Sequence, residues 1–182
     1  MSKFKDVFYK WFYVEEKAPG LLSITPEKLK SMGVKVIALD ADNTSSFDRT
    51  TEPIPGAVEW VDGMKKAGFK LVLLSNGKKT RAKILADQYG IPVLGLCCKP
   101  LPFGYWRAVL KFRKKPDKFV MIGDQLFTDI WGANMWGYQS IWCKPVGKDR
   151  KQKIGFAVKR FLEKAVAFYI DKTYEKYREK EG

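Results

Sequence analysis

Val36-Ile37-Ala38-Leu39-Asp40-Ala41-Asp42-Asn43-Thr44 is the stretch of sequence that decides the fold. The apolar residues before Asp40 form a run that favours a buried β-strand. Two carboxylates, one residue apart, follow this run at once. In open α/β sheets, ligands bind beyond the carboxyl ends of the strands. The stretch therefore predicts a strand that carries acidic side chains into a site.

Four further apolar runs repeat this pattern, with helical patterns between them. The predicted strands span residues 35–40, 69–75, 92–96, 118–123 and 138–143. Helices are predicted from Ala57 to a stop at Gly68, and over residues 79–89, 104–113 and 126–135. Alternating strands and helices predict an α/β fold, in which a mainly parallel sheet of about five strands has helices on both faces.

The composition fits one soluble domain of ordinary size. The chain has 182 residues, of which 46% are hydrophobic and 30% charged. No apolar run reaches the roughly 18 residues of a membrane-spanning helix, and the N-terminus does not read as a secretory signal. Three cysteines without framework spacing argue against a disulfide scaffold. We expect each to be a small buried hydrophobe, and the protein to stay in a cytoplasmic compartment.

The absence of histidine excludes several kinds of chemistry. A Ser-His-Asp or Cys-His catalytic arrangement cannot be built, nor can the usual nitrogen-rich zinc site. Any metal must be a hard cation held by oxygen ligands. The formal net charge of +14 favours anionic partners, which include nucleic acid, a phospholipid surface and a phosphorylated substrate.

Polar residues gather where the predicted strands end. Asp40 and Asp42 can share the work of phosphoryl transfer, because one carboxylate can attack phosphorus while the other protonates the leaving oxygen. Two such charges repel and need a cation such as Mg²⁺. The later strands are followed by residues suited to bind phosphate or complete a metal site: Ser75-Asn76-Gly77, Lys99-Pro100 and Asp124 with Asp129.

Together these residues resemble the four motifs of the haloacid dehalogenase (HAD) superfamily of phosphatases. The resemblance covers about residues 35–145 and is carried by Asp40-Ala41-Asp42-Asn43-Thr44, Ser75-Asn76, Lys99-Pro100 and Gly123-Asp124-x4-Asp129. It implies a Rossmann-like three-layer sandwich and a Mg²⁺ cofactor. One departure is Ser45, where the family usually has an aliphatic residue.

The resemblance also implies a role for each site residue. Asp40 would be the nucleophile that forms an aspartyl-phosphate, and Asp42 the general acid/base, whose backbone carbonyl also meets the metal. Lys99 would stabilise the phosphoaspartate. The implied metal residues are Asp40, Asp42, Asp124 and, in support, Asp129. The implied substrate-binding residues are Thr44, Ser75, Asn76 and Lys99.

Gly-Asp-Gln-Leu-Phe-Thr-Asp-Ile (123–130) and Ile24-Thr25-Pro26-Glu27-Lys28-Leu29 narrow the resemblance to the YqeG-type branch of subfamily IIIA. This branch includes phosphatidylglycerophosphate phosphatases, enzymes of phospholipid biosynthesis. The sequence also leaves no space for the cap domain that many members carry, because only 45–54 remains as a short flap. We therefore expect an open site that accepts phosphates on macromolecules or at a membrane.

The two ends of the chain are expected to form helices around one catalytic domain. Residues 1–34 would be an N-terminal amphipathic segment, with Phe4, Phe8, Trp11 and Phe12 on one helical face. Residues 35–146 would be the catalytic core. Residues 147–182 would be a basic amphipathic helix with eleven basic against six acidic residues, a net charge of +5. Both ends either lie on the inner face of the cytoplasmic membrane or pack on the core.

Three functions compete at this point. The first is a Mg²⁺-dependent phosphatase acting on phosphatidylglycerophosphate, with anionic phospholipid as a partner. The second is the same chemistry on a soluble phosphate ester or a phosphoprotein. The third is a non-enzymatic nucleic-acid-binding protein. The basic residues are spread along the chain and no RNA-binding motif is present, so no nucleic-acid partner is expected.

Overall fold

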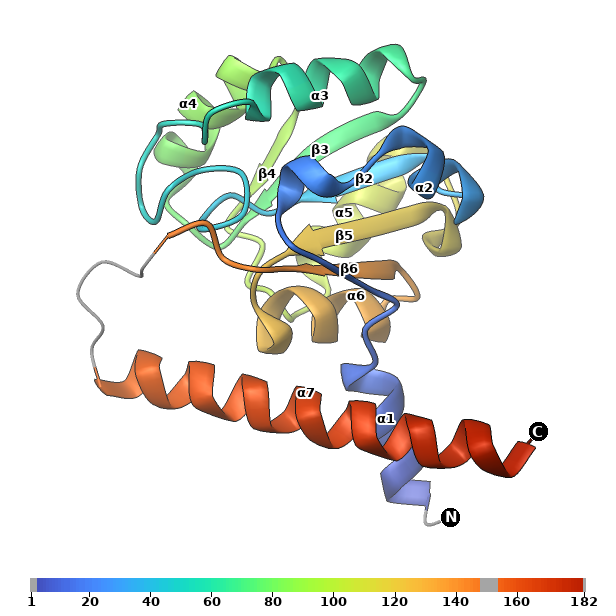
Figure 1. The fold of residues 1–182 in the computed structure, drawn as a ribbon. Helices are drawn as coiled ribbons and strands as arrows, with labels where there is room; N and C mark the ends of the chain where they lie inside the picture. The colour runs from blue at the N-terminus through green and yellow to red at the C-terminus, as the bar shows by residue number, and fades with distance from the viewer. Residues whose placement is uncertain (1–2, 148–153, 182) are drawn as a thin grey trace.

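A six-stranded parallel sheet organises the chain, in the order β1-β6-β5-β2-β3-β4 (Figure 1). We describe it from a computed structural model that covers residues 3–147 and 154–181, with side chains placed for residues 7–147 and 157–172. The strands are β1 (Glu16–Ala18), β2 (Val36–Leu39), β3 (Lys70–Ser75), β4 (Val93–Gly95), β5 (Phe119–Gly123) and β6 (Gln139–Cys143).

Helices connect the strands and cover both faces of the sheet. They are α1 (Lys3–Phe12), α2 (Pro26–Ser31), α3 (Ala57–Lys66), α4 (Lys79–Tyr89), α5 (Phe103–Phe112), α6 (Trp131–Met135) and α7 (Ile154–Glu181). Three short turns are also helical: η1 (Leu21–Ser23), η2 (Pro116–Lys118) and η3 (Leu126–Ile130), the last a π-helical turn. Thr25 caps α2 as its position before Pro26 predicts, because its hydroxyl accepts a hydrogen bond of 3.3 Å from the amide of Lys28.

Alternation of side chains along the central strands fills two separate cores. Ile37 and Leu39 point to the face covered by α3 and α4. Val36 and Ala38 point to the face covered by α5 and α6. Because every residue of β2 is buried, the strand reads as a continuous apolar run. The predicted Rossmann-like three-layer sandwich is confirmed.

The structure adds a strand that the sequence pattern does not show. β1 has only three residues and pairs with β6 in parallel, with Glu16 opposite Ile141. Such a short edge strand carries no readable alternation. The predicted boundary at residue 34 stays a prediction, and β1 places part of that N-terminal segment inside the sheet.

One expectation is wrong: Cys98 is exposed, whereas Cys97 and Cys143 are buried as expected.

No cap domain is inserted between the described strands. After β2 the chain forms a flap, in which Ser46 makes isolated bridges to Asp42 and to Pro53. The next connection, between β3 and β4, contains α4 alone. Among the described residues we find no helix with the length and apolar character needed to cross a bilayer.

The terminal helices pack together against η3 and α6. Phe12 of α1 is buried with Leu126, Ile130 and Ala167, so residues from both ends of the chain share one small core. Phe8 lies 4.9 Å from Phe12, ring centre to ring centre. Trp11 is partly exposed, and the side chain of Phe4 lies outside the residues that the structure describes.

Two glycines in helices give a test of how tightly α5 packs on the strand ends. A Cβ at Gly104 would lie 2.6 Å from the Cβ of Cys97, whereas a Cβ at Gly63 in α3 would meet nothing within 4 Å. We expect Gly104→Ala to lower the free energy of unfolding by about 1–3 kcal/mol through overpacking. Gly63→Ala should raise it by roughly 0.5–1 kcal/mol through helix propensity. Urea denaturation measures both, and equal stability of the two variants would contradict the packing described here.

Candidate active site

Three buried carboxylates meet at the carboxyl edge of the sheet. Asp40 follows β2, Asp124 follows β5 and Asp129 lies in η3, and one carboxylate oxygen from each lies within 4.8 Å of the others. β2 and β5 are neighbours in register, with Leu39 opposite Ile122, so Asp40 and Asp124 emerge close together. The predicted meeting of side chains at one edge of the sheet is therefore observed for Asp40, Asp124 and Asp129.

Gly123 and the η3 turn together place Asp129. The Asp129 carboxylate accepts a hydrogen bond of 3.1 Å from the amide of Gln125, which ties it to the start of the turn. A Cβ at Gly123 would overlap this carboxylate, since it would lie 2.6 Å even from the Cβ of Asp129. Glycine therefore stands before Asp124 because a larger residue would push Asp129 out of the cluster.

Lys99 joins two of the carboxylates. Its ammonium donates to Asp40 at 2.5 Å and to Asp129 at 2.6 Å, and its side chain is only 2% exposed. Asn76 holds the backbone of Lys99 from both sides. The Lys99 amide donates to the Asn76 side chain at 2.7 Å, and the Asn76 side chain donates to the Lys99 carbonyl at 3.0 Å. Asn76 thus fixes the lysine loop, a use that the sequence does not suggest.

Burial and the neighbouring charges shift the pKa values of the residues in this cluster. Burial raises the pKa of Asp40 well above its ordinary value, although the charge of Lys99 partly opposes this. Burial alone would lower the pKa of Lys99, but the charges of Asp129 and Asp40 outweigh it and raise that pKa well above its usual range. Burial also raises the pKa of Asp124 to about 7.

The donor set fits a hard divalent cation. Three buried carboxylates converge, all the donors are oxygens, and the chain contains no histidine. Added positive charge would favour the ionised carboxylates that burial disfavours. Asp42 is not part of this carboxylate cluster, so only its backbone carbonyl remains as its predicted contact with a metal.

Arg81 holds the carboxylate of Asp42. Its guanidinium donates to both carboxylate oxygens, at 2.5 and 2.7 Å, and the amide of Arg49 adds a bond of 2.8 Å. Arg81 also donates to the carbonyl of Thr50 at 3.2 Å, which ties α4 to the flap. A Cβ at Gly77 would overlap this guanidinium, so the glycine after Ser75-Asn76 leaves space for it.

The remaining predicted residues line the same edge. Thr44 is buried and its hydroxyl lies 3.5 Å from an oxygen of Asp124. Ser75 is buried at the end of β3 and accepts a bond of 3.0 Å from the amide of Gly77. Its hydroxyl proton is therefore available to donate. Ser45, the departure from the family pattern, is buried and donates to the carbonyl of Asp40 at 2.7 Å.

Arg160 of α7 reaches the cluster from the C-terminal end of the chain. It forms an ion pair with the Asp124 carboxylate and donates to the Asp124 carbonyl at 2.8 Å. It also donates to Glu163 at 3.2 Å, and buried Glu163 in turn accepts 3.2 Å from the amide of Phe127. Between α7 and the ends of β1 and β6 lies a cavity of about 380 Å³, bounded by Asp124, Trp142 and Lys144 among others.

Sequence analysis missed both arginines, although each left a signal. Arg81 stands in the first turn of α4, where acidic residues are favoured and a cation opposes the helix dipole. Arg160 and Glu163 are oppositely charged residues three positions apart, a spacing that places them on the same face of a helix. Neither signal names the carboxylate that the arginine contacts.

Comparisons with known proteins agree with this geometry. The chain matches the family described as "Hydrolase: haloacid dehalogenase-like hydrolase" over residues 25–137. It is 39% identical over 138 residues to the probable phosphatase YqeG of Bacillus subtilis, which covers 75% of this chain and 80% of that protein. It is 32% identical over 126 residues to the mitochondrial phosphatidylglycerophosphatase of Saccharomyces cerevisiae, covering 61% and 67% of the two chains.

A solved structure supports the fold. An uncharacterized protein from Listeria monocytogenes serotype 4b superposes with a TM-score of 0.53 at 18% identity, over 66% of this chain and 85% of that one. The four sequence motifs, the acidic cluster and the family match point the same way. The chain belongs to the haloacid dehalogenase-like hydrolase family and is a phosphoric monoester hydrolase.

Proposed function

We propose that this hydrolase is Mg²⁺-dependent, works through an aspartyl-phosphate on Asp40, and removes the terminal phosphate of phosphatidylglycerophosphate. The observation that carries the chemistry is the buried ammonium of Lys99, held between Asp40 and Asp129 beside Asp124. Asp40, Asp124 and the carbonyl of Asp42 would hold the cation with support from Asp129. Bound there, it would neutralise phosphate charge and orient the phosphoryl group for in-line attack.

In the first step, a carboxylate oxygen of Asp40 bonds to phosphorus and the bond to the leaving oxygen breaks. Asp42 gives its proton to that oxygen, so the alcohol leaves neutral. Lys99, Ser75 and Thr44 bind the phosphoryl oxygens, with Asn76 holding Lys99 in place. In the second step, Asp42 takes a proton from water, whose oxygen bonds to phosphorus. The bond to Asp40 then breaks, which releases inorganic phosphate and restores the carboxylate.

Arg81 acts in this scheme as a positioning residue. Two parallel hydrogen bonds fix the plane of the Asp42 carboxylate, and the third bond from the Arg49 amide fixes its rotation. In the first step Asp42 is protonated on one oxygen, which gives up its bond to Arg81 and donates to the leaving oxygen, while the other oxygen stays bound to Arg81. In the second step the ionised carboxylate accepts a proton from water. We therefore assign the orientation of the acid/base to Arg81.

A lipid substrate is supported by the open edge and by the relatives. Among the described residues, the flap and the α4 connection hold no inserted domain that would cover the site. Two relatives act on phosphatidylglycerophosphate by name, the yeast enzyme and the chloroplastic phosphatase 1 of Chlamydomonas reinhardtii, which is 29% identical over 71% of this chain and 51% of its own length. The cavity beside Asp124 offers space for the part of the headgroup beyond the reacting phosphate.

The alternative substrate is a soluble phosphate ester or a phosphoprotein. The open site favours it equally, because nothing in the chemistry of the cluster depends on acyl chains. A panel of phosphatidylglycerophosphate in detergent micelles, glycerol 3-phosphate and sugar phosphates separates the two. We expect kcat/KM to be at least about 10-fold higher for the lipid, which equals roughly 1.4 kcal/mol of added transition-state binding. A preference for the small esters would favour the alternative.

Asp40→Asn should lower phosphate release by at least about 10³-fold, because a neutral amide cannot replace the carboxylate as the nucleophile that forms the aspartyl-phosphate. Asp62→Asn is the matched control, since Asp62 is exposed on α3 and its one ion pair among the described side chains is with Lys65. Circular dichroism should show the same fold for both variants. Near-normal turnover by Asp40→Asn would refute the nucleophile assignment.

Removal of divalent cations with EDTA should abolish turnover, and excess Mg²⁺ should restore it, because three buried carboxylates need a counter-charge in order to bind an anionic phosphate. Phosphate release measured before and after chelation checks this. Full activity in EDTA, with metal content verified by elemental analysis, would contradict a metal-dependent mechanism.

Arg81→Ala should lower kcat by roughly 10-fold or more while leaving KM little changed, because Asp42 keeps its chemistry but loses its fixed orientation. Lys83→Ala on the same helix is the control, since Lys83 pairs with exposed Asp87. Arg81→Lys, which keeps the charge but not the parallel bonds, should recover only part of the rate. Equal kcat for Arg81→Ala and Lys83→Ala would refute the positioning role.

A further inference from the structure

Helix α7 buries part of its apolar surface, with Ala167 and Ile170, in the small core that it shares with α1, and leaves a second set of apolar side chains exposed. Arg160 and Glu163 face the site, and Glu163 is 1% exposed. On the other side, Phe161 is 71% and Phe168 69% exposed, with three further exposed apolar side chains beside them. We call this set the outer stripe of α7, and it consists of Val158, Phe161, Leu162, Phe168 and Tyr169.

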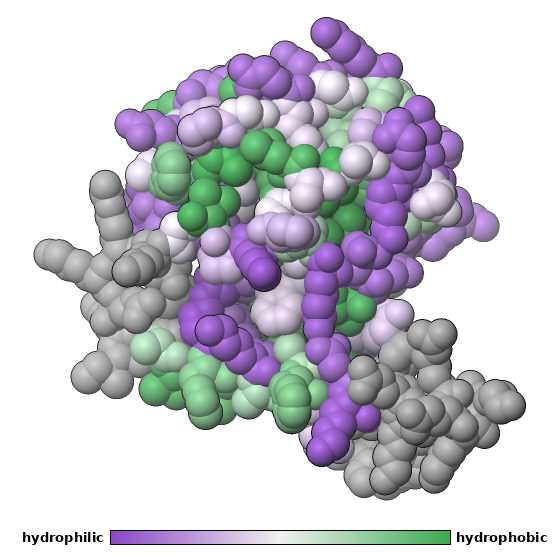
Figure 2. All heavy atoms as spheres, viewed as in Figure 1, coloured by the Kyte–Doolittle hydropathy of each residue, from purple (hydrophilic) through white to green (hydrophobic). Residues whose placement is uncertain are grey.

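The outer stripe is continuous along the helix. With 3.6 residues per turn, its five side chains fall within an arc of about 120° on the side opposite Glu163, and Ala165 lies in the same arc. Ala167 and Ile170 already bury the inner face of α7, and surface helices normally keep their outer face polar, so this second, exposed apolar arc needs a physical reason. Figure 2 shows the apolar side chains gathered along α7 at the lower front of the molecule.

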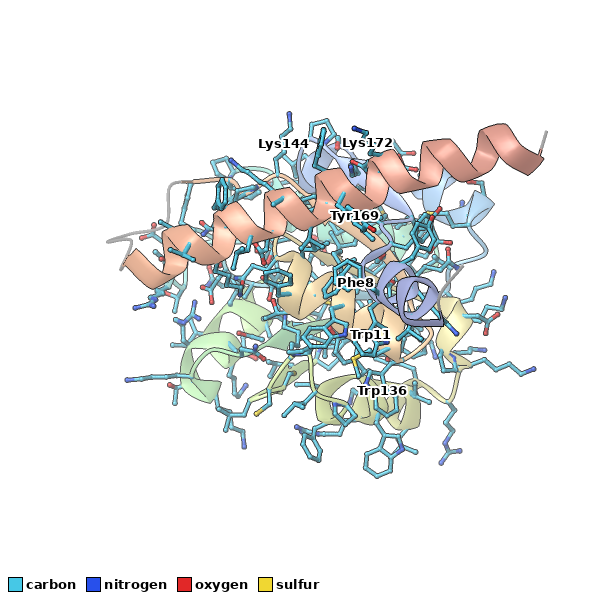
Figure 3. All side chains as sticks on the ribbon, turned by 90° about the horizontal axis from the view of Figure 1, so that it is seen from below. Phe8, Trp11, Trp136, Lys144, Tyr169 and Lys172 are labelled. Carbon is cyan, nitrogen blue, oxygen red and sulfur yellow. The ribbon has the colours of Figure 1, made fainter. Side chains whose placement is uncertain are left out.

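Lysines lie beside the stripe and within it: on the helical wheel Lys164 falls just outside the arc, and Lys172 falls inside it near its C-terminal end. Lys164 and Lys172 are exposed on α7, and Lys144 is exposed at the end of β6. None of these three ammonium groups forms an ion pair with another residue of the described ranges. Figure 3 shows Lys144 and Lys172 along one edge of α7, and Tyr169, Phe8 and Trp11 in succession on the other side of it. Tyr169 contacts Phe8 of α1 with ring centres 6.2 Å apart, so the apolar face extends onto α1.

We infer that the outer stripe of α7 docks on a bilayer that contains anionic phospholipid, with the helix axis in the plane of the membrane. An exposed apolar arc with lysines near it is the pattern of helices that lie in a membrane interface. The inference deepens the proposed function, because it supplies the contact through which a lipid phosphate would be presented.

Charge favours a bilayer over a second copy of the chain. The net charge of +14 makes two copies repel, whereas an anionic leaflet attracts lysines near its surface. A stable protein interface also needs roughly 1,200 Å² or more of total buried surface, which is much for one stripe of a single helix. A bilayer needs no matching partner surface and accepts the stripe as it is.

The inner face of α7 links this docking to the site. Arg160 binds the carboxylate and carbonyl of Asp124, and Glu163 binds the amide of Phe127 in η3. The ion pair between Lys17 and Asp171 attaches the helix to β1 as well. These contacts hold α7 at a fixed place beside the acidic cluster, so a membrane that contacts the outer stripe lies near the cluster.

The test replaces the stripe without touching the site. Phe161→Ser/Phe168→Ser removes its two most exposed rings, and Leu110→Ser/Ile84→Ser removes two comparably exposed apolar side chains on α5 and α4 as a matched control. Flotation is measured with vesicles of phosphatidylcholine alone and of phosphatidylcholine with phosphatidylglycerol. Thermal melts check that both variants fold.

We expect the unchanged chain and the control to float with anionic vesicles only, less so at high salt. The Phe161→Ser/Phe168→Ser chain should bind these vesicles at least about 10-fold more weakly. Its hydrolysis of a soluble phosphate ester should stay within about 2-fold of normal, as expected when the loss is confined to docking. Lys164→Gln/Lys172→Gln should reduce the salt-sensitive part of binding.

Two results would overturn the inference. One is equal flotation of the stripe variant and the control. The other is a dimer in light scattering that becomes a monomer in the stripe variant, which would assign the stripe to a second copy. The proposed function fails separately: vesicle binding without release of phosphate from phosphatidylglycerophosphate in micelles would refute the substrate alone. Release of phosphate in micelles without any flotation would refute the docking alone.

Discussion

The ammonium of Lys99 between Asp40 and Asp129 is the interaction on which the rest of the site depends. Three carboxylates buried within a few ångströms of one another would repel, and each loses hydration. Lys99 offsets part of that cost, and Asn76 fixes the loop that carries it. The sheet contributes by bringing the ends of β2 and β5 into register, and Gly123 contributes by leaving space for Asp129.

Two arginines offset the charge of the other carboxylates in the same way, so that each carboxylate of the site has a cationic neighbour. Arg81 binds Asp42 from α4, and Arg160 binds Asp124 from α7. The carboxylates nonetheless differ in surroundings: Asp40 is buried beside Lys99, whereas Asp42 is partly exposed beneath the flap. That difference in exposure fits the roles proposed above, in which Asp40 forms the aspartyl-phosphate and Asp42 exchanges protons with water.

The sequence predicted the fold and the meeting of the strand ends because both follow from local patterns. Apolar runs mark β2, β3 and β5, and a parallel sheet brings their ends to one edge. β1 was missed because three residues show no alternation. The π-helical turn that begins at Leu126 was predicted as part of an ordinary helix, because five residues are too few to separate the two helical periods. Arg81 and Arg160 were missed because their partners lie 39 and 36 residues away, and no local rule links such pairs.

The contact between Arg160 and Asp124 shows that the site includes a residue outside the part of the chain that carries the four motifs. The family match stops at residue 137, and all four motifs lie inside it. Yet one neighbour of Asp124 comes from a helix beyond that limit. A boundary drawn at the end of the family match would cut through the site rather than around it. Chains that share the motifs but carry no arginine at this place on a final helix would leave Asp124 without this neighbour.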